Sequence, residues 1–446
     1  MIGMEGRKRS CRVMLTTFGS LGDLHPYIAI ALKLKERGHE PVVATMDLFR
    51  AKVEEAGLTF RSIRALRGER PDQELMKRVM DQRTGGEFIV RNLLMPALRD
   101  AYEDTAAAVE DADILVAHPM SLATQLVAEV RGIPWASTQL APMSFFSPFD
   151  PPVLAPAPLL SKLRFLGPTL HRPLFRLLKR TIRSWSEPYR RMRAELGLPP
   201  APEPLLGGMH SPRLVLALFS KLLGAEQPDW PPHTVVTGFP FYDQDGDTGL
   251  DPELSRFLED GPPPIVFTLG TSAVMDAGQF YQNSAVATRR LGRRAVLLVG
   301  QEPSNRPTSL PEGIVAFDYA PFSELFPRAA AIVHQGGVGT TGQAMRSGRP
   351  MLVMPYAHDQ PDNAERVRRL GIARTVPRNL YDADRAVHEL NTLLSDPGYS
   401  ERATWVGERV QQEDGVVAAC DALESLLDTV VGQHRKRISG PPLVLD

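Results

Sequence analysis

A short apolar run that ends in a glycine-rich turn and leads into a helix is the feature of this chain that most restricts its fold. The run spans residues 331–334, and a second apolar run follows at 351–354. The segment between them begins with the turn and hydroxyl residues Gly336, Gly337, Gly339, Thr340 and Thr341. Strand, turn, helix and strand in this order predict a βαβ unit, the repeating element of a parallel sheet.

The same alternation recurs in both halves of the chain. Apolar runs bounded by turn residues predict first-half strands at 13–18, 41–45, 113–116, 135–138, 213–217 and 235–238. They predict second-half strands at 265–269, 295–299, 314–317, 331–334 and 351–354. Helical spacing of apolar residues predicts intervening helices, as at 27–37 and 122–130.

A chain of 446 residues is too long for one typical domain. We predict a first domain at 1–240, a linker rich in Asp, Gly and Pro at 241–263, and a second domain at 264–446. The last helix is a candidate for return to the first domain. The predicted fold class is α/β, with two parallel-sheet domains that face each other across a cleft.

Composition excludes several classes of protein. A net charge of −1 argues against nucleic acid as a general partner, because such proteins usually carry a basic excess. Cys11 and Cys420 lie at opposite ends of the chain and predict neither a disulfide framework nor a cysteine-based metal site. No apolar run has the length of a membrane span. We expect a cytoplasmic protein, with peripheral attachment to the inner membrane face left open.

The glycine-rich turn has the chemistry of an anion site. Glycines let the backbone approach a ligand closely, and the first N–H groups of a helix face that ligand with the positive end of the helix dipole. A phosphate or diphosphate is the natural occupant. Asp359 and Gln360 follow the next predicted strand, and a carboxylate beside an amide suits the hydroxyls of a sugar.

His334, the glycine-rich turn, the hydroxyls and the Asp359–Gln360 pair, in this register, resemble the donor-binding signature of the UDP-glycosyltransferase superfamily. Members of that superfamily are inverting enzymes that use nucleotide-diphosphate sugars. The resemblance implies the GT-B fold, in which two Rossmann-like domains face each other. It also implies that the second domain binds the donor and the first domain binds the acceptor.

The resemblance assigns roles to individual donor-site residues. His334 would hydrogen-bond the diphosphate beside the N–H and hydroxyl donors of the turn, and Asp359 and Gln360 would hold the sugar. Tyr319 would stack on the nucleobase, where related enzymes often carry Trp, and Ala320 would contact the edge of the base through its backbone. Gln343 stands near the usual ribose-binding Glu. The turn after the first strand of the second domain adds Gly270, Thr271 and Ser272.

The catalytic base has three candidates. Inverting transfer needs a group that takes the proton of the acceptor hydroxyl. Many superfamily members place a His three residues before the proline of the segment 19–26, and this chain has Asp23 there, as in some bacterial relatives that act on natural products. His25 is out of register. His118 stands near the place where related enzymes keep a carboxylate partner, so Asp23 and His118 are expected to form a pair with exchanged roles.

These residues predict an inverting, metal-independent transferase that needs no cofactor. It would move a hexose from a UDP- or dTDP-sugar to a hydroxyl of a small hydrophobic or lipid-like acceptor. Two alternatives stay open. A nucleotide-sugar epimerase uses the same architecture without an acceptor, and a catalytically silent nucleotide-sugar-binding protein would dispense with Asp23.

A basic region at 162–193 is not explained by this function. Its Lys and Arg residues alternate with Leu, Phe and Trp, and only Glu187 and Glu195 oppose them. Such a pattern is typical of a solvated helix face. The alternative is an element that contacts the acceptor or an anionic membrane surface, because cationic faces with interleaved apolar residues suit such interfaces.

Overall fold

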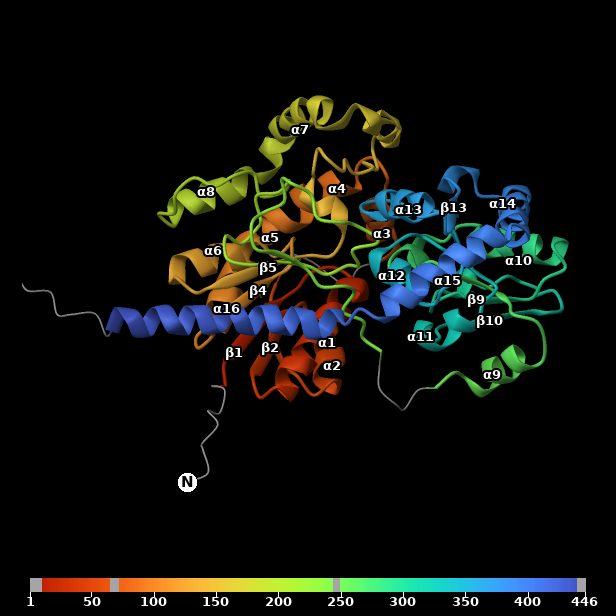
Figure 1. Ribbon diagram of the computed structural model, residues 1–446, viewed down its shortest axis with the longest axis horizontal. Coiled ribbons are helices and arrows are strands. Elements are labelled where there is room, and N and C mark those ends of the chain that lie inside the picture. Colours follow the sequence, from red (N-terminus) through yellow and green to blue (C-terminus); the bar gives the residue numbers. More distant parts are fainter. Residues whose placement is uncertain (1–9, 65–71, 244–248, 439–446) are drawn as a thin grey trace, which may run out of the picture.

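The chain forms two α/β domains that lie side by side along the long axis of the molecule (Figure 1). The computed structural model describes residues 10–64, 72–243 and 249–438, with the side chains of the last helix described to residue 429. Part of the predicted linker, residues 244–248, lies outside the described ranges.

The first domain is built on a seven-stranded parallel sheet with the order β3-β2-β1-β4-β5-β6-β7. Its strands are β1 (Arg12–Thr16), β2 (Glu40–Thr45), β3 (Thr59–Ser62), β4 (Ile114–Ala117), β5 (Trp135–Gln139), β6 (Val215–Ala217) and β7 (Thr234–Val236). Its helices are α1 (Leu21–Glu36), α2 (Arg50–Glu55), α3 (Gln73–Val79), α4 (Gly85–Phe88), α5 (Met95–Ala108), α6 (Leu122–Arg131), α7 (Gly167–Ile182) and α8 (Glu187–Glu195).

The second domain is built on a six-stranded parallel sheet with the order β10-β9-β8-β11-β12-β13. Its strands are β8 (Ile265–Thr268), β9 (Ala295–Leu298), β10 (Ile314–Phe317), β11 (Ala331–His334), β12 (Met351–Val353) and β13 (Ala373–Thr375). The helices of this half are α9 (Pro252–Glu259), α10 (Phe280–Arg290), α11 (Phe322–Leu325), α12 (Val338–Arg346), α13 (Gln360–Arg369), α14 (Ala383–Ser395), α15 (Pro397–Gln411) and α16 (Gly415–Ile438).

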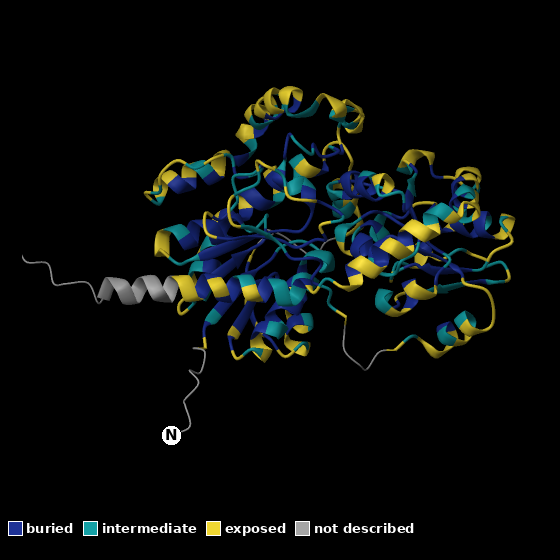
Figure 2. Ribbon diagram, viewed as in Figure 1, coloured by how far each residue is buried: buried dark blue, intermediate teal, exposed yellow. Residues whose placement is uncertain are grey.

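The central strands of both sheets are covered by helices on both faces, so β4, β8 and β11 are buried along their whole length, and only the last residues of β8 and β11 are polar. Figure 2 shows this as dark blue strands under helices whose outer faces are yellow. In each sheet the strand order reverses once, between β1 and β4 and between β8 and β11. Ligands of open α/β sheets bind beyond the carboxyl ends of the strands at such switch points, so the topology marks one such place in each domain.

The last helix crosses from the second domain to the first. Cys420 and Leu423 of α16 belong to the same buried cluster as Val13 and Tyr27 of the first domain. On the surface, Arg37 pairs with Asp421 at 2.6 Å. Figure 1 shows α16 lying beside α1. The apolar face of α16 is therefore part of the core of the first domain.

Several elements differ from the sequence-based expectations. The short strands β3 and β13 were not predicted, because each lies at a sheet edge and has few buried residues. The predicted linker contains helix α9, which Asp251 caps. Helix α1 begins at Leu21, within the segment expected to be a loop. None of the helices in the described ranges has the length and apolar character that a membrane crossing requires.

Candidate active site

Asp23 stands in the first turn of α1, at the β1 side of the first switch point. Ser20 caps the helix by accepting the N–H of Gly22, and Oδ2 of Asp23 accepts the backbone N–H of Ser20 at 2.7 Å and its hydroxyl at 3.0 Å. Gly19 has a φ of +129°, and a Cβ there would lie 2.3 Å from Oδ2 of Asp23. The glycine therefore makes room for the carboxylate, whose second oxygen remains outside this cap.

His118 follows β4, on the other side of the same switch point. Its ring Nδ1 accepts the backbone N–H of Met120 at 3.1 Å. Nδ1 is thus the accepting nitrogen, and Nε2 is the nitrogen that can donate; it lies 3.4 Å from Oδ1 of Asp23. Both ring nitrogens are thus engaged, and the structure brings together the two residues that the sequence predicted as a pair.

The carboxylate, not the imidazole, is open to the cleft. The side chain of Asp23 is 33% exposed, whereas that of His118 is 5% exposed. Burial alone would raise the pKa of Asp23, but the hydrogen bond and charge of His118, with the two donors of Ser20, hold it below its usual value. Asp23 is therefore ionised at neutral pH, the state in which a carboxylate can accept a proton.

His25 points away from this pair. Its ring lies 5.3 Å from that of Tyr242, and burial together with the charge of Lys52 lowers its pKa to about 4. It stands two positions after Asp23, which places the two side chains on different faces of α1. This geometry favours Asp23 over His25 as the base.

The second half of the site surrounds the start of α12, at the β8–β11 switch point. Gly337 is the N-cap of α12, and no side chain caps the helix. The side chain of Gln335 lies between the turn at Gly270 and the turn at Gly337. A Cβ added to Gly270 would lie 2.3 Å from Nε2 of Gln335, and a Cβ added to Gly337 would lie 2.8 Å from the same atom. The same Cβ at Gly270 would lie 3.4 Å from Oγ1 of Thr340. The turn of Gly270, Thr271 and Ser272 therefore lies against the start of α12.

The ring of His334 lies in the core rather than at the cleft. Its side chain is fully buried, Nδ1 accepts the N–H of Gly336 at 3.1 Å, and Nε2 lies 3.4 Å from Sδ of Met351. Burial lowers its pKa to about 3, so the ring is neutral. Both ring nitrogens therefore have partners within the second domain, and neither is left for the predicted hydrogen bond to a diphosphate. His334 instead holds the glycine-rich turn through the N–H of Gly336.

Three further residues were predicted to contact the donor, and the structure shows the surroundings of each. Gln343 donates to Asp243 at 3.3 Å and accepts from Arg346 at 2.9 Å, so its amide belongs to a network with the linker. Tyr319 is 66% exposed, as a residue that stacks on a ligand would be, and Ala320 is buried beneath it.

Asp359 and Gln360 stand at the start of α13, after β12. The amide oxygen of Gln360 accepts the N–H of Tyr356 at 2.9 Å, which leaves its NH₂ group for a ligand. Oδ2 of Asp359 accepts from Asn363 at 2.7 Å. Burial raises the pKa of Asp359 to about 7, and the nearby charge of Asp23 adds to this rise, while Asn363 opposes it. The carboxylate of Asp23 in the first domain therefore lies close enough to Asp359 in the second domain to raise its pKa.

His358 is a site residue that the sequence analysis missed. It adopts a left-handed backbone with φ of +58°, which is unusual for a residue other than glycine. Burial lowers its pKa, while the backbone of Val79 in α3 and the charge of Asp23 oppose that shift. The sequence indicated His358 only through its place directly before Asp359. That place does not reveal that His358 contacts Val79 of the first domain.

Several buried polar atoms in the second half of the site have no hydrogen-bond partner among the residues that the structure describes. They are Oε1 of Gln335, Oγ1 of Thr341, Oδ1 of Asn363 and Nε2 of His358. Buried polar groups are normally satisfied, and exceptions gather where a ligand or water belongs. Among the described residues, no group of three or more His, Cys, Asp and Glu side chains is placed to hold a metal ion.

Helix α13 also ties the two domains together, through residues that the sequence analysis did not single out. Arg366 pairs with Asp362 at 2.6 Å and with Asp150 of the first domain at 2.5 Å. Asp362 accepts the backbone N–H of Val153 at 2.9 Å. The segment 150–153 is thus held against the helix that begins at Gln360, directly after Asp359.

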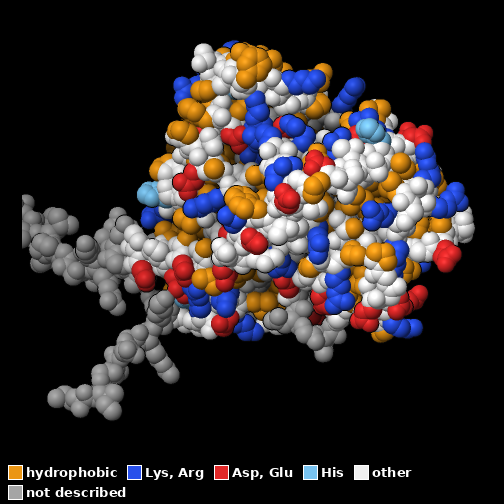
Figure 3. Space-filling model, turned by 45° about the vertical axis from the view of Figure 1, so that its right-hand side comes forward, with side chains coloured by type: hydrophobic (Ala, Val, Ile, Leu, Met, Phe, Trp, Pro, Cys, Tyr) orange, Lys and Arg blue, Asp and Glu red, His pale blue; other side chains and the backbone are white. Residues whose placement is uncertain are grey.

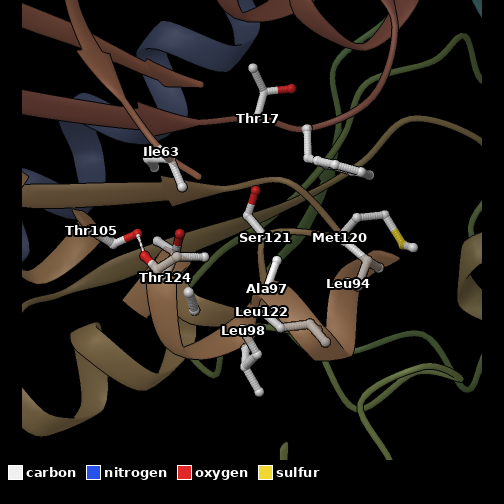
Figure 4. A pocket seen from close by; sticks show the side chains of 13 residues that line it. Thr17, Ile63, Leu94, Ala97, Leu98, Thr105, Met120, Ser121, Leu122 and Thr124 are labelled. Carbon is white, nitrogen blue, oxygen red and sulfur yellow. Dashed lines mark hydrogen bonds between the residues drawn. The ribbon is translucent and has the colours of Figure 1, made fainter. Parts of the chain in front are cut away.

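An apolar cavity adjoins the Asp23–His118 pair. Its volume is about 30 Å³. Figure 4 shows side chains from three places converging on it: Thr17 before α1, Met120 and Ser121 after β4, and Leu94 and Leu98 around the start of α5. The volume suits a water molecule rather than the acceptor of a sugar.

Comparison with known proteins agrees with this geometry. A family model described as the glycosyltransferase family 28 N-terminal domain matches residues 13–145. A model described as the erythromycin biosynthesis protein CIII-like C-terminal domain matches residues 289–417. The chain is 34% identical over 439 residues to O-mycaminosyltylonolide 6-deoxyallosyltransferase of Streptomyces fradiae, covering 95% of this chain and 99% of that protein. The chain belongs to the UDP-glycosyltransferase superfamily.

A more distant relative of this glycosyltransferase is the sterol 3-beta-glucosyltransferase UGT80A2 of Arabidopsis thaliana, which is 26% identical. The match covers 92% of this chain and 65% of the length of that protein. Solved structures share the GT-B fold. The calicheamicin glycosyltransferase CalG4 superposes with a TM-score of 0.70 at 16% identity, over 95% of this chain and 100% of that chain. VinC in complex with dTDP superposes with a TM-score of 0.66 at 19% identity, over 94% and 100%.

Proposed function

We propose that this glycosyltransferase moves a hexose, with inversion, from a nucleoside-diphosphate sugar to a hydroxyl of an apolar acceptor of the macrolide or sterol kind. One observation carries the proposal. The Asp23–His118 pair stands at the switch point of the first sheet, and the charge of Asp23 reaches His358 and Asp359, which follow β12 of the second.

The geometry supports a direct displacement. Oδ1 of Asp23, which also faces Nε2 of His118, takes the proton of the acceptor hydroxyl on its remaining lone pair, and the acceptor oxygen forms its bond to the anomeric carbon. The bond from that carbon to the diphosphate oxygen breaks, and its electron pair leaves with the diphosphate. His118 keeps Asp23 ionised and oriented, because its Nε2–H faces Oδ1.

Departure of the diphosphate builds negative charge at the second switch point. The start of α12 offers N–H groups that no side chain caps, and the hydroxyl of Thr341 is buried without a partner. Preorganised donors of this kind stabilise charge as it develops. We assign the diphosphate to this turn and to the adjoining Gly270–Ser272 segment, and the sugar hydroxyls to Asp359 and to the NH₂ group of Gln360.

Donor and acceptor classes come from the relatives' names. One solved relative holds dTDP, and the S. fradiae relative is named for transfer of a 6-deoxyhexose to a tylonolide, so a dTDP-hexose is the first donor to test. A macrolactone and a sterol are the acceptors to test, because the S. fradiae relative is named for a tylonolide and the A. thaliana relative for a sterol.

The test is release of nucleoside diphosphate from dTDP-hexoses and UDP-glucose, each with a macrolactone, a 3β-hydroxysterol or no acceptor. Release that depends on an acceptor and yields the inverted glycoside supports the proposal. Epimerised sugar from donor alone would contradict it. Binding of the donor without reaction across the acceptor panel would instead favour a silent nucleotide-sugar-binding protein.

A further inference from the structure

An arm of the first domain stands away from both sheets. It comprises the 3₁₀ helix Pro158–Leu166 and helix α7 (Gly167–Ile182) with Arg183, and we call residues 158–183 the basic hairpin. Figure 1 shows α7 at the edge of the molecule, beyond the helices that cover the sheet. None of its residues lies in the site described above.

The basic hairpin carries charge of one sign. It contains seven Lys and Arg residues and no Asp or Glu, although the whole chain has a net charge of −1. Arg164 pairs with Asp150. No Asp or Glu in the described ranges lies within ion-pair distance of the five others that are exposed, which are Lys162, Arg172, Arg176, Arg180 and Arg183. The excess positive charge is therefore free to meet an anionic partner.

The same segment exposes large apolar side chains. Phe165 is 80% exposed, Leu159 71% and Leu177 62%, and Leu163, Leu166 and Leu170 are also exposed. Six of the eleven exposed large hydrophobic residues of the described chain thus fall within these 26 positions. Figure 3 shows orange and blue side chains together over the top of the molecule, and Figure 2 shows the exposed outer surface of α7. Such a concentration of apolar surface marks an interaction site.

The two kinds of side chain occupy adjacent stripes of α7. His171, Phe175 and Ile182 form its buried face. At 3.6 residues per turn, Leu170 and Leu177 fall on one outer stripe. Arg172, Arg176 and Arg183 fall on a second stripe about 130° away around the helix, and Arg180 lies between the two. An apolar ridge flanked by cations is the form of a helix that lies in the plane of a membrane interface, with Leu among the acyl chains and Arg among the phosphates.

The basic hairpin is tied to the cleft rather than loosely attached. Arg164 shares Asp150 with Arg366 of α13, the helix that begins beside Asp359. A surface bound by the hairpin would therefore lie in a fixed orientation to the active-site cleft.

We propose that the basic hairpin is a docking surface for an anionic lipid membrane. Its cations bind lipid phosphates, and Leu159, Phe165, Leu166, Leu170 and Leu177 insert at the boundary of the acyl chains. This role adds to the proposed glycosyl transfer and does not depend on it.

The test is cosedimentation of the full chain with vesicles of phosphatidylcholine alone and of phosphatidylcholine with about 30% phosphatidylglycerol, a content in the anionic range that attracts polybasic segments. We expect binding only to the anionic vesicles, weakened by 0.5 M salt. The triple variant Arg176→Gln, Arg180→Gln, Arg183→Gln should lower the partition coefficient about 100-fold, because each cation near such a surface contributes about fivefold. A second variant, Leu159→Ser with Phe165→Ser, should lower binding even though every charge is kept.

The matched control removes the same number of charges elsewhere, as Arg131→Gln, Arg289→Gln, Arg293→Gln, all exposed positions outside the hairpin. It should bind like the wild type, and all variants should keep the same melting temperature and the same shift with thymidine diphosphate. Equal vesicle binding by the hairpin and control variants would overturn the proposal, as would equal binding to neutral vesicles. Loss of a dimer with unchanged vesicle binding would also overturn it and identify the surface as a contact between copies of the chain.

Discussion

Nε2 of His118 lies 3.4 Å from Oδ1 of Asp23, and the carboxylate is the more exposed of the two side chains. The residues are separated by 95 positions in the chain but follow β1 and β4, which are neighbours at the switch point of the first sheet. The other ring nitrogen of His118 accepts a backbone N–H. In the proposed mechanism this arrangement makes the carboxylate the proton acceptor and the imidazole the group that positions it.

Asp23→Asn should lower kcat about 10²- to 10⁴-fold, the usual contribution of a general base. The amide keeps an oxygen that can accept from Ser20, so the cap of α1 and binding of nucleoside diphosphate should persist. Stopped assays of diphosphate release and thermal shift with dTDP check the two halves of this prediction. Ser20→Ala is the control for the cap, because it removes a donor to Asp23 but leaves the carboxylate. A turnover near that of the wild type in Asp23→Asn would remove Asp23 from the mechanism.

His118→Asn should move the acidic limb of the pH profile of kcat/KM to higher pH. Burial raises the pKa of Asp23, and His118 is the first of the groups that oppose this rise. Without the ring, Asp23 should stay protonated over a wider range and be inactive as a base there. A uniform loss of rate with an unmoved limb would mean that His118 acts only through the fold.

The sequence predicted the strands and turns of the site better than the directions of its side chains. Gly270 and Gly336 were found because a turn after a buried strand has a local signature. The ring of His334 was expected to face a ligand, but it packs beside Met351 of the neighbouring strand, a contact between residues 17 positions apart that no local pattern encodes. Gln343 is held by Asp243 of the linker, a contact that no local pattern encodes.

Asp359→Asn should stabilise the protein at pH 8 and have less effect at pH 5. The folded state raises the pKa of Asp359 to about 7, so between about pH 4 and pH 7 the folded chain holds a proton that the unfolded chain has lost. Stability from this group is therefore present at low pH and is lost as the pH rises through the folded pKa. The loss has an upper limit of about 1.4 kcal/mol for each pH unit that separates the folded from the unfolded pKa. Melting temperatures at both pH values check the sign, with the exposed Asp260→Asn as control. A variant that gains as much at pH 5 as at pH 8 would contradict the assignment.

Diphosphate release should be unaffected by excess EDTA. The donors assigned to the diphosphate are the N–H groups at the start of α12 and nearby hydroxyls, and these need no metal to hold an anion. The measurement is the rate of acceptor-dependent release before and after chelation, and again after addition of Mg²⁺. Loss of activity that Mg²⁺ restores would contradict this interpretation of the site.

Gly270→Ala should weaken nucleoside diphosphate binding as well as the fold. Gly270 has a φ of +64°, and its new Cβ would lie 2.3 Å from Nε2 of Gln335, whose side chain also lies against the turn at Gly337. The substitution therefore adds a displacement of Gln335 to a backbone cost of about 1–2 kcal/mol for a side chain in the left-handed region.

Gly292 provides the matched control for Gly270→Ala. Its φ is +61°, and a Cβ there meets no atom within 4 Å, so Gly292→Ala carries the backbone cost alone. We expect both variants to lose melting temperature, with the greater loss in Gly270→Ala. Only Gly270→Ala should also raise the Kd for dTDP, by about tenfold if one hydrogen bond's worth of binding is lost. If the two variants bind dTDP equally well, Gln335 does not link the two turns around the diphosphate, and the donor would have to be placed elsewhere in the second domain.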